Sequence, residues 1–412
     1  MKQVSVVIST YTADVSGVCS ALYELGGMVV IHDPSGCNST YNTHDEPRWY
    51  EMDSLVFISG LSEIDAIMGN DDKFIQDIIR AAKELHPSFI ALVRTPVPMM
   101  IGTDFEAIRD ILSEETGLPV FYFPTNGMHS YIQGVEMALE TVAERLVDDI
   151  DSEKTGKEIK EETESISINL LGVTPLDFSV NTTLCSVKRY LEQNGCEIIS
   201  SFAMGSSLNE IARAGEARVN LVVSASGLLA AKKLKERFGT PYVIGIPTGV
   251  FGENVLEKIK KAARTKSSGK AYEMGLEMKQ DVEAVSEIYM IGEPVIAQSL
   301  QKAIFLEYGV YVRIICPLEV SKDILLPDCI IAESEEELAK YLQNAAAVIA
   351  DPMYRPICSE GVRFFSLPHE AFSGRIYRKE IPDLSSVDYL RSFVLEYKKL
   401  VEKQEINNDR PV

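Results

Sequence analysis

Short apolar runs alternate along the chain with longer stretches that are apolar on one side only. In the first third, runs typical of buried β-strands lie at 4–10, 28–33, 54–59, 88–95 and 119–125. The stretch at 71–86 predicts an amphipathic helix, because its apolar residues recur at helical spacing. They are Phe74, Ile75, Ile78, Ile79 and Ala82. Strands that alternate with helices in this way predict parallel sheets covered by helices.

The same alternation of strands and helices begins twice more along the chain, each time after a polar segment. Residues 148–165 are charged and almost free of large apolar side chains, which is typical of a linker. A third series begins where a strand leads through Gly292, Glu293 and Pro294 into a helix. We therefore predict an α/β fold of three Rossmann-like domains with mainly parallel sheets. The predicted parts are domain I at 1–150, a charged linker at 151–165, domain II at 166–280 and domain III at 281–412 with its C-terminal tail.

The composition of the 412 residues narrows the class of protein. A formal net charge of -21 opposes binding to a phosphate backbone, so we expect no nucleic-acid partner. No apolar run approaches the length of about 18 residues that spans a membrane, and the first residues lack a signal sequence. The seven cysteines are scattered without a CxxC motif, which favours a reducing compartment. We expect a cytoplasmic protein without membrane association, in which Cys316 and Cys329 are buried structural residues.

The clearest candidate for chemistry is the loop after the strand at 28–33, within "MVVIHDPSGCNSTY". In an open α/β sheet, ligands bind beyond the carboxyl ends of the strands, where this Cys37 loop (residues 33–41) begins. Pro34 and Gly36 predict a tight turn whose backbone can closely approach a bound group. From the residues alone, Cys37 is a reactive thiol, a metal ligand or a small residue of the turn. No HxxxH, HExxH or GxSxG motif accompanies it.

Two further turns carry weaker signals. Thr103 and Glu106 have the spacing of a capping box, which explains both as a helix start. The glycines in "IGIPTGVFGENVLEKI" indicate a turn with left-handed residues rather than a phosphate loop. No P-loop motif occurs in the sequence, so we do not expect this chain to hydrolyse ATP.

"HDPSGC" after one strand and "RTPVPMMIGTD" after another resemble loops of the component 1 family of nitrogenase and nitrogenase-like reductases. The similarity continues through "SFAMGSSLNEIARAGEARVNLVVSASGLLAAKKLKERFGTPYV" and "IYMIGEPVIAQSLQKAIFLEYG". This resemblance implies three Rossmann-like domains per chain and an iron–sulfur cluster at a dimer interface. It also implies a separate ATP-hydrolysing iron–sulfur reductase protein, similar to the nitrogenase iron protein, as the electron donor.

The resemblance also implies a ligand set, from which this sequence departs. The middle cysteine of the family falls on Cys37, whereas the first falls near Ala13 or Asp14 and the third near Pro96. Asp14 is the better-placed auxiliary ligand, because Cys19 lies five or six residues further along the predicted helix. Gly36 would let the backbone approach the cluster. We therefore expect Cys37, with Asp14 or Cys19, to hold a [4Fe-4S] cluster.

A cubane cluster takes four protein ligands, and two copies of this chain would supply them across a homodimer interface. The rival arrangement is a heterodimer with a related chain that keeps three cysteines. The resemblance implies a catalytic component that passes electrons through this cluster to an unsaturated small molecule, as in the tetrapyrrole-reducing branch. The alternative is a cluster-free scaffold or assembly protein that binds a metal cofactor or tetrapyrrole without reducing it. Candidate substrate loops are 124–130, 247–252 and 351–356, and the reductase would dock near 45–50.

Overall fold

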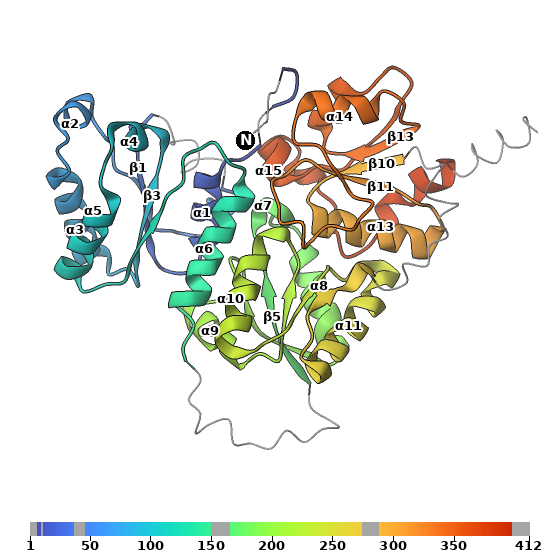
Figure 1. The fold of residues 1–412 in the computed structure, drawn as a ribbon, viewed down its shortest axis with the longest axis horizontal. Coiled ribbons are helices and arrows are strands. Elements are labelled where there is room, and N and C mark those ends of the chain that lie inside the picture. The colour runs from blue at the N-terminus through green and yellow to red at the C-terminus, as the bar shows by residue number, and fades with distance from the viewer. Residues whose placement is uncertain (1–5, 10, 37–45, 150–164, 274–287, 398–412) are drawn as a thin grey trace, which may run out of the picture.

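The computed structural model describes residues 6–9, 11–36, 46–149, 165–273 and 288–397, and it contains three parallel sheets (Figure 1). The first sheet has the strand order β2-β1-β3-β4. Its strands are β1 (Met28–His32), β2 (Val56–Ile58), β3 (Ile90–Arg94) and β4 (Val120–Phe123). These are four of the five apolar runs predicted in this part of the chain.

The second sheet has the order β6-β5-β7-β8-β9. Its strands are β5 (Ile166–Leu171), β6 (Cys196–Ser201), β7 (Val219–Val222), β8 (Tyr242–Ile244) and β9 (Gly269–Lys270). The third sheet has the order β12-β11-β10-β13-β14. Its strands are β10 (Ile288–Ile291), β11 (Arg313–Cys316), β12 (Ile330–Ile331), β13 (Ala347–Ala350) and β14 (Arg363–Ser366). The predicted α/β fold with three Rossmann-like parallel sheets is confirmed.

Helices connect these strands and cover the sheets. In the first unit they are α1 (Asp14–Leu22), α2 (Glu63–Met68), α3 (Asp72–Leu85), α4 (Pro96–Ile101), α5 (Phe105–Thr116) and α6 (Tyr131–Arg145). The second unit has α7 (Pro175–Phe178), α8 (Thr183–Gln193), α9 (Leu208–Ala212), α10 (Leu228–Phe238) and α11 (Gly252–Thr265). The third has α13 (Pro294–Tyr308), α14 (Glu335–Leu342) and α15 (Glu370–Ser373). The five apolar residues predicted to form one face of α3 are its buried residues.

Two local predictions were wrong. Among residues 4–10, those that the structure describes (6–9) form no strand; instead the backbone N–H groups of 6–8 donate to the Glu335 carboxylate. The N-cap of α5 is Asp104 rather than Thr103, and its side chain accepts a hydrogen bond from Ala107 N–H. In both places a single carboxylate accepts hydrogen bonds from backbone N–H groups. The pattern of hydrophobic residues contains no information about such bonds.

Helices α1 and α6 cross where each has a glycine. A Cβ atom added at Gly17 would lie 2.3 Å from the Tyr131 carbonyl oxygen, and one at Gly134 would lie 1.9 Å from the Asp14 carbonyl oxygen. The two backbones therefore touch directly. Because α6 also packs against α10 of the second unit, this crossing fixes the first sheet relative to the second (Figure 1).

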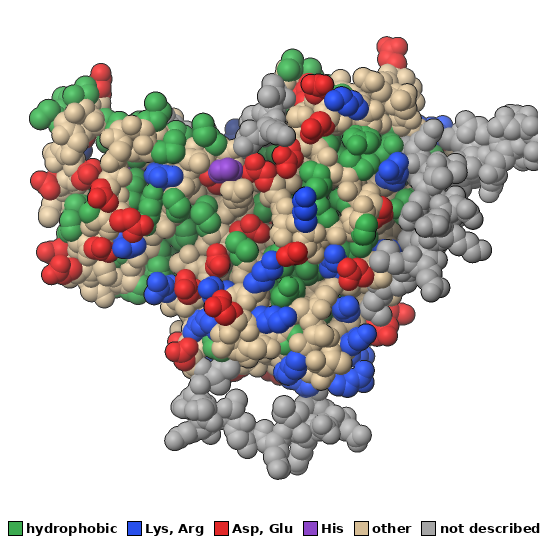
Figure 2. Space-filling view, in the orientation of Figure 1, with side chains coloured by type: hydrophobic (Ala, Val, Ile, Leu, Met, Phe, Trp, Pro, Cys, Tyr) green, Lys and Arg blue, Asp and Glu red, His purple; other side chains and the backbone are tan. Residues whose placement is uncertain are grey.

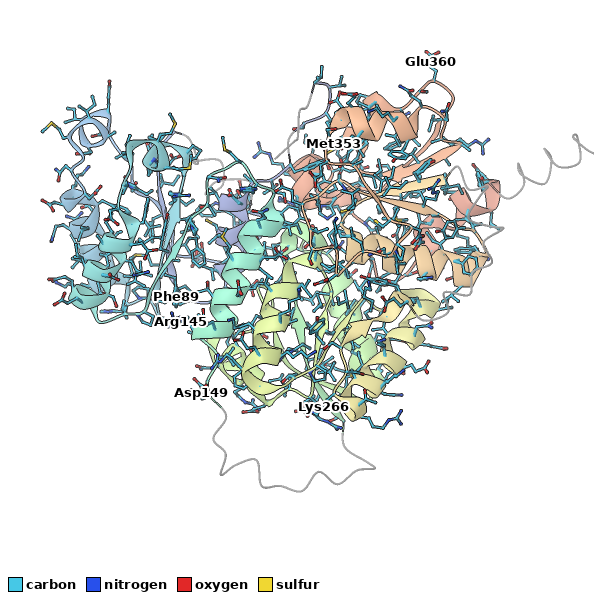
Figure 3. All side chains as sticks on the ribbon, in the orientation of Figure 1. Phe89, Arg145, Asp149, Lys266, Met353 and Glu360 are labelled. Carbon is cyan, nitrogen blue, oxygen red and sulfur yellow. The ribbon has the colours of Figure 1, made fainter. Side chains whose placement is uncertain are left out.

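The lower end of α6 is tied to the second unit by one arginine. Arg237 of α10 donates to the carbonyl oxygens of Ala143 and Val147 and to the Asp149 carboxylate. Figure 3 shows Asp149 below Arg145, beside the second unit. The predicted linker at 151–165 lies, except for its last residue, outside the described residues.

The C-terminal segment returns from the third unit to the second. Thr248 Oγ1 donates to the Leu384 carbonyl, Leu384 N–H donates to Thr183 Oγ1, and Asp383 accepts hydrogen bonds from Thr182 and Ser186. Figure 2 shows acidic and basic side chains interspersed on the face that it draws. Within the described ranges, every helix is too short or too polar to cross a lipid bilayer.

Candidate functional site

The carboxyl ends of β1, β2 and β3 hold the start of the Cys37 loop in place. Thr95 Oγ1, after β3, lies 2.6 Å from the Asp33 carboxylate and 2.8 Å from the His32 carbonyl oxygen. Ser59 Oγ, after β2, accepts a hydrogen bond from Asp33 N–H. Asp33, the first residue of the loop, is therefore anchored at the sheet edge where α/β folds bind ligands. Cys37 itself lies outside the described residues.

Asp14, the predicted auxiliary ligand, begins α1 and is buried, with 1% of its surface exposed. Its Oδ1 accepts hydrogen bonds from the backbone N–H groups of Val15 and Gly127, and its Oδ2 accepts one from Asn126. A carboxylate offers about four acceptor positions, so one on Oδ2 remains beyond these three bonds. Asp14 thus holds the loop that follows β4.

The position of the third family cysteine meets the same loop. Pro96 is the first residue of α4, and a Cβ added at Gly127 would lie 3.4 Å from its ring. Arg94, two residues earlier, donates to the carbonyl oxygens of Pro124 and Thr125. The structure therefore brings residues 14 and 96, which are separate in the sequence, to one loop beside the anchored Asp33.

Cys19 is not brought to this edge. Its side chain is fully buried in the hydrophobic core, and burial, followed by the negative charge of Glu46, raises the pKa of its thiol well above the usual range. A buried thiol of this kind is protonated and inert. For Cys19 to bind metal, α1 would have to rotate or shift.

His32 also points away from the loop. Its ring stacks on Phe74 with centroids 4.0 Å apart, and its Nδ1 lies 2.8 Å from Ser59 Oγ. Burial lowers the pKa of His32 to about 4, so the imidazole is neutral at pH 7. The structure thus places His32 on the opposite face of the sheet from the core that contains α1.

The described surroundings of Gly36 are open. A Cβ added at Gly36 would meet no described atom within 4 Å. The helices that follow β2 and β3 expose large apolar side chains, visible in green over α2 and α4 in Figure 2. They include Ile64, Ile67 and Met68 of α2 and Met100 of α4, and Met128 is exposed in the loop after β4. We call this set of five side chains the apolar rim. Exposed apolar surface of this kind is typical of protein interfaces.

The segment predicted to receive the reductase is largely buried. Arg48 forms ion pairs with Glu46 and Glu24, and it also donates to the carbonyl oxygens of Ser20 and Ala203. These bonds tie residues 46–48 to α1 and to the second unit. Among the described residues of this segment, only Tyr50 is largely exposed.

A polar cleft of about 390 Å³ lies between the start of α1 and α15. Its lining includes Tyr11, Ala13 and Ser16 on one side and Leu176, Glu370 and Arg375 on the other. The Tyr11 hydroxyl lies 2.6 Å from the Tyr354 hydroxyl, and the Tyr11 ring packs on Phe372 with centroids 4.7 Å apart. The cleft reaches the second and third units beside the helix that carries Asp14.

A buried polar cluster, which we call the junction site, lies where the three units meet. Asp177 of α7 accepts hydrogen bonds from the hydroxyls of Tyr131 and Ser224, and His369 Nε2 lies 3.4 Å from Asp177 Oδ1. Glu293, the N-cap of α13, accepts hydrogen bonds from backbone N–H groups of 225 and 296. Asp177, Glu293 and His369 line one small cavity of about 30 Å³.

The three candidate substrate loops converge near this cluster. Loop 124–130 leads directly into Tyr131, and Asp351 of loop 351–356 accepts a hydrogen bond from the backbone N–H of His369. Loop 247–252 is bonded through Thr248 to Leu384, which lines the cavity. Their role in binding a substrate stays a prediction.

The sequence did not identify Asp177 or Tyr131 as members of a polar site. The Gly292, Glu293, Pro294 turn was visible as the start of a Rossmann-like unit, but not as part of a cluster. His369 gave no interpretable motif. The only signal was indirect: Tyr131, Asp177 and Glu293 follow predicted strands, whose carboxyl ends gather at ligand sites. The strand that precedes His369, β14, was not predicted.

The described residues do not by themselves supply ligands for an iron–sulfur cluster. No group of three or more histidine, cysteine or carboxylate side chains suitable for a metal ion occurs within the described ranges. Asp14 is already bonded to three N–H groups and Cys19 is buried. A cluster at this edge therefore depends on Cys37.

Comparison with known proteins identifies the class. Residues 16–316 match the family model described as nitrogenase component 1 type oxidoreductase. Because the match covers most of the chain, the chain belongs to this family. The resemblance of its loops to component 1 proteins is thereby confirmed.

Curated relatives have different roles within this family. The nitrogenase molybdenum-iron protein alpha chain of Methanothermobacter thermautotrophicus is 30% identical over 52% of this chain and 47% of its own length. The nitrogenase iron-molybdenum cofactor biosynthesis protein NifE of a Nostoc species is 26% identical over 52% of this chain and 43% of its own length. One of the subunits of the light-independent protochlorophyllide reductase of Nostoc punctiforme is 26% identical over 50% and 41%. The matches thus span less than half of each relative.

Solved structures described as nitrogenase Cp1 share the fold. The one at pH 6.5 has a TM-score of 0.56 and 16% identity, covering 98% of this chain and 74% of its own. The one at pH 5 has a TM-score of 0.55 and 17% identity, covering 83% and 72%. At such identities the likeness establishes the fold alone.

Proposed function

We propose that this chain is the catalytic component of a nitrogenase-like, ATP-dependent reductase. It would take electrons from a separate ATP-hydrolysing iron–sulfur protein and reduce an unsaturated small molecule, with a tetrapyrrole as the first substrate class to test. A [4Fe-4S] cluster shared by two chains would supply one-electron transfer between the reductase and that substrate. Family membership and the relative named as a light-independent protochlorophyllide reductase support this proposal.

The observation that carries the proposal is the convergence of three positions at one sheet edge. The turn before Cys37 is anchored by Thr95, while Asp14 and Pro96 meet at the loop after β4. No described atom lies within 4 Å of a Cβ added at Gly36, which supports room for a bound group there. A turn that is held firmly yet leaves its glycine clear of described atoms is suited to close approach by a bound group.

Cys37 is the principal ligand in this proposal. Asp14 is favoured over Cys19 as the auxiliary ligand, because one acceptor position of its Oδ2 remains and the Cys19 thiol is sealed in the core. Two ligands from each chain would complete a four-iron cluster in a homodimer. The apolar rim, on the same sheet edge, supports a protein interface there. A heterodimer with a related chain would use the same face.

The first experiment is anaerobic purification, followed by measurement of iron, acid-labile sulfide and mass in solution. We expect a dimer with about two irons per chain, because one four-iron cluster would be shared by two copies. Cys37→Ala should lose this iron. Cys185→Ala is the matched control, because Cys185 is exposed and lies in the second unit. A Cys37→Ala protein with a full iron complement would refute the ligand assignment.

Gly36→Ala gives an independent test of the same edge. The added methyl group would meet no described atom within 4 Å, so the variant should fold with the stability of the parent. A lower iron content in this variant would place the bound group within contact of residue 36. Unchanged iron would argue that the cluster lies elsewhere.

A scaffold or assembly protein is the second candidate function. The relative named as an iron-molybdenum cofactor biosynthesis protein supports it, as does the burial of Cys19 away from the edge. In that case the purified protein should bind a metal cofactor or tetrapyrrole equally well with and without iron. Equilibrium binding to the iron-free protein, compared between the parent and Cys37→Ala, separates the two functions.

A further inference from the structure

The junction site collects side chains from the carboxyl ends of strands in all three units. Tyr131 follows β4, Asp177 follows β5, Glu293 follows β10 and His369 follows β14. Asp177 and Glu293 are almost completely buried, at 2% and 1% exposure. Burying ionisable groups is unfavourable unless a compensating interaction or a retained proton offsets it.

The two carboxyl groups lack a lysine or arginine as ion-pair partner among the described residues. Within the described part of the chain, neither Asp177 nor Glu293 forms an ion pair with a lysine or arginine, and only His369 approaches Asp177. Burial, followed by the negative charge of Asp177, raises the pKa of Glu293 to about 8. With its pKa raised in this way, Glu293 holds a proton at neutral pH inside the cavity that Asp177 also lines. Other titratable groups facing the cluster are Tyr131, Tyr272, Cys316, Asp351 and Tyr354.

His369 has nitrogen atoms available for proton transfer. Neither ring nitrogen has a hydrogen-bond partner among the described residues, although Nε2 lies 3.4 Å from Asp177 Oδ1. The backbone of His369 is fixed by its N–H bond to Asp351, and its ring stacks on Phe372 with centroids 4.4 Å apart. The imidazole is therefore held in place while its nitrogens stay uncommitted, which suits a group that accepts and gives protons.

One layer of residues separates this site from the polar cleft. On α7, Leu176 lines the cleft and the next residue, Asp177, lines the cavity. On the other side, His369 lines the cavity and Glu370 lines the cleft, while Phe372 lines both. A small molecule in the cleft would therefore lie across a wall one residue thick from the buried acid.

We propose that Asp177, Glu293 and His369 form a proton-donating site for a substrate bound in the cleft between α1 and α15. This inference rests on the proposed function. Reduction of one double bond consumes two electrons and two protons, giving two new C–H bonds from C=C. The electrons come from the ATP-hydrolysing iron–sulfur partner. The protons come from this site, which is refilled from water, so its three residues end each cycle unchanged.

Infrared spectroscopy of the full chain tests proton storage without an activity assay. The proteins are compared in a Glu136→Gln background, because burial also raises the pKa of Glu136 to about 7. We expect the C=O absorption of a protonated carboxylic acid at neutral pH, which disappears as the pH rises through about 8. The band should be lost in Glu293→Gln and retained in Glu253→Gln. Glu253 is the matched control because it is an exposed glutamate in the first turn of another helix, α11. A parent spectrum without the band at neutral pH would overturn the proposal.

Hydrogen exchange distinguishes a carboxylic acid that can donate its proton from one that is buried without access to water. On transfer of the folded protein into D2O, the carboxylic acid band should shift within the mixing time, because a site that is refilled from water must exchange quickly. His369→Gln should slow this shift at least tenfold while the band itself remains. A band that shifts only on the timescale of unfolding, or at the parent rate in His369→Gln, would refute the relay.

Two safeguards keep the test decisive. Glu293→Gln replaces one of the two oxygens that accept hydrogen bonds from backbone N–H groups, so this variant can lose stability as well as the acid. Asp177→Asn therefore serves as a second variant, which removes the neighbouring carboxylate instead. If both variants fail to fold, the exchange rate of the parent band still decides. The iron measurements on Cys37→Ala address the proposed function alone, because Cys37 lies on the first unit and contributes nothing to this band.

Discussion

Asp14 and Asp177 show how the partners of a carboxylate decide what it can do. Asp14 is surrounded by backbone N–H groups, which hold it in position but do not release protons under ordinary conditions. Asp177 is surrounded by two hydroxyls and an imidazole, all of which can exchange protons. The first arrangement anchors a loop; the second permits chemistry.

The neutral state of His32 gives a pH-dependent prediction. Its pKa is lowered to about 4 by burial, from 6.5 in the unfolded chain. As the pH falls below 6.5, His32 becomes protonated in the unfolded state while it stays neutral in the folded state. The free energy of unfolding therefore decreases. At pH 4 the loss from this one group is about 3 kcal/mol. Urea denaturation between pH 7 and pH 4 should show a shallower decline for His32→Gln. Equal declines in the two proteins would contradict this account.

At the residue scale, the sequence predicted the turn before Cys37, but it did not predict the buried carboxyl groups of the junction site. "HDPSGC" after a strand is a local pattern, and its Pro34 and Gly36 have local reasons to be there. Asp177 and Glu293 become a pair only because separate units meet, and no local pattern encodes that distance. Their neighbours Thr174 and Pro294 indicate only helix starts.

At the scale of elements, hydrophobic periodicity located the four strands of the first sheet and α3, and it failed where polar groups decide the structure. Helix α4, which the apolar pattern did not predict, contains two prolines. Pro96 occupies the first helical position, where its fixed φ and missing N–H do no harm. Where a strand was expected at 4–10, the backbone N–H groups of residues 6–8 donate to Glu335, from a helix in the third unit. Distant partners of this kind cannot be seen in local sequence.

The crossing of α1 and α6 gives a prediction for an element pair. Replacing glycine with alanine inside a helix usually stabilises it by about 1 kcal/mol. Gly134→Ala should do the reverse and destabilise the protein by about 3 kcal/mol, because the new methyl group would collide with the Asp14 carbonyl. Chemical denaturation measures this, with Gly36→Ala as the control whose added methyl group would meet no described atom within 4 Å. Equal stability of the two variants would mean that the helices can separate at no cost.

At the scale of the whole molecule, the alternation of strands and helices was enough to predict three α/β units. The patterning did not show how the units are joined. Helix α6 belongs to the first unit in sequence but packs on α10 of the second, and the end of the chain crosses from the third unit to the second. The second of these contacts brings Leu384 to the wall of the junction cavity.

The C-terminal crossing can be tested by truncation. Ending the chain after Glu380 removes Asp383 and Leu384, together with their bonds to α8 and Thr248. We expect a fall in melting temperature of roughly 10 °C and increased binding of a hydrophobic dye, because apolar surface of the second and third units would be uncovered. Ending after Tyr397 is the control, since all of these bonds remain. Equal melting temperatures would show that the crossing does not stabilise the molecule.

The walls of the junction cavity extend along the chain from Asp177 to Leu384, which has a consequence for biosynthesis. A ribosome makes the chain from its N-terminus, and domains fold in that order. Asp177 and Glu293 are therefore complete, and in contact with water, before His369 and Leu384 have been made. In water both carboxylates are ionised. Closure of the cavity then raises the pKa of Glu293 to about 8, so closure takes up a proton from the surrounding water.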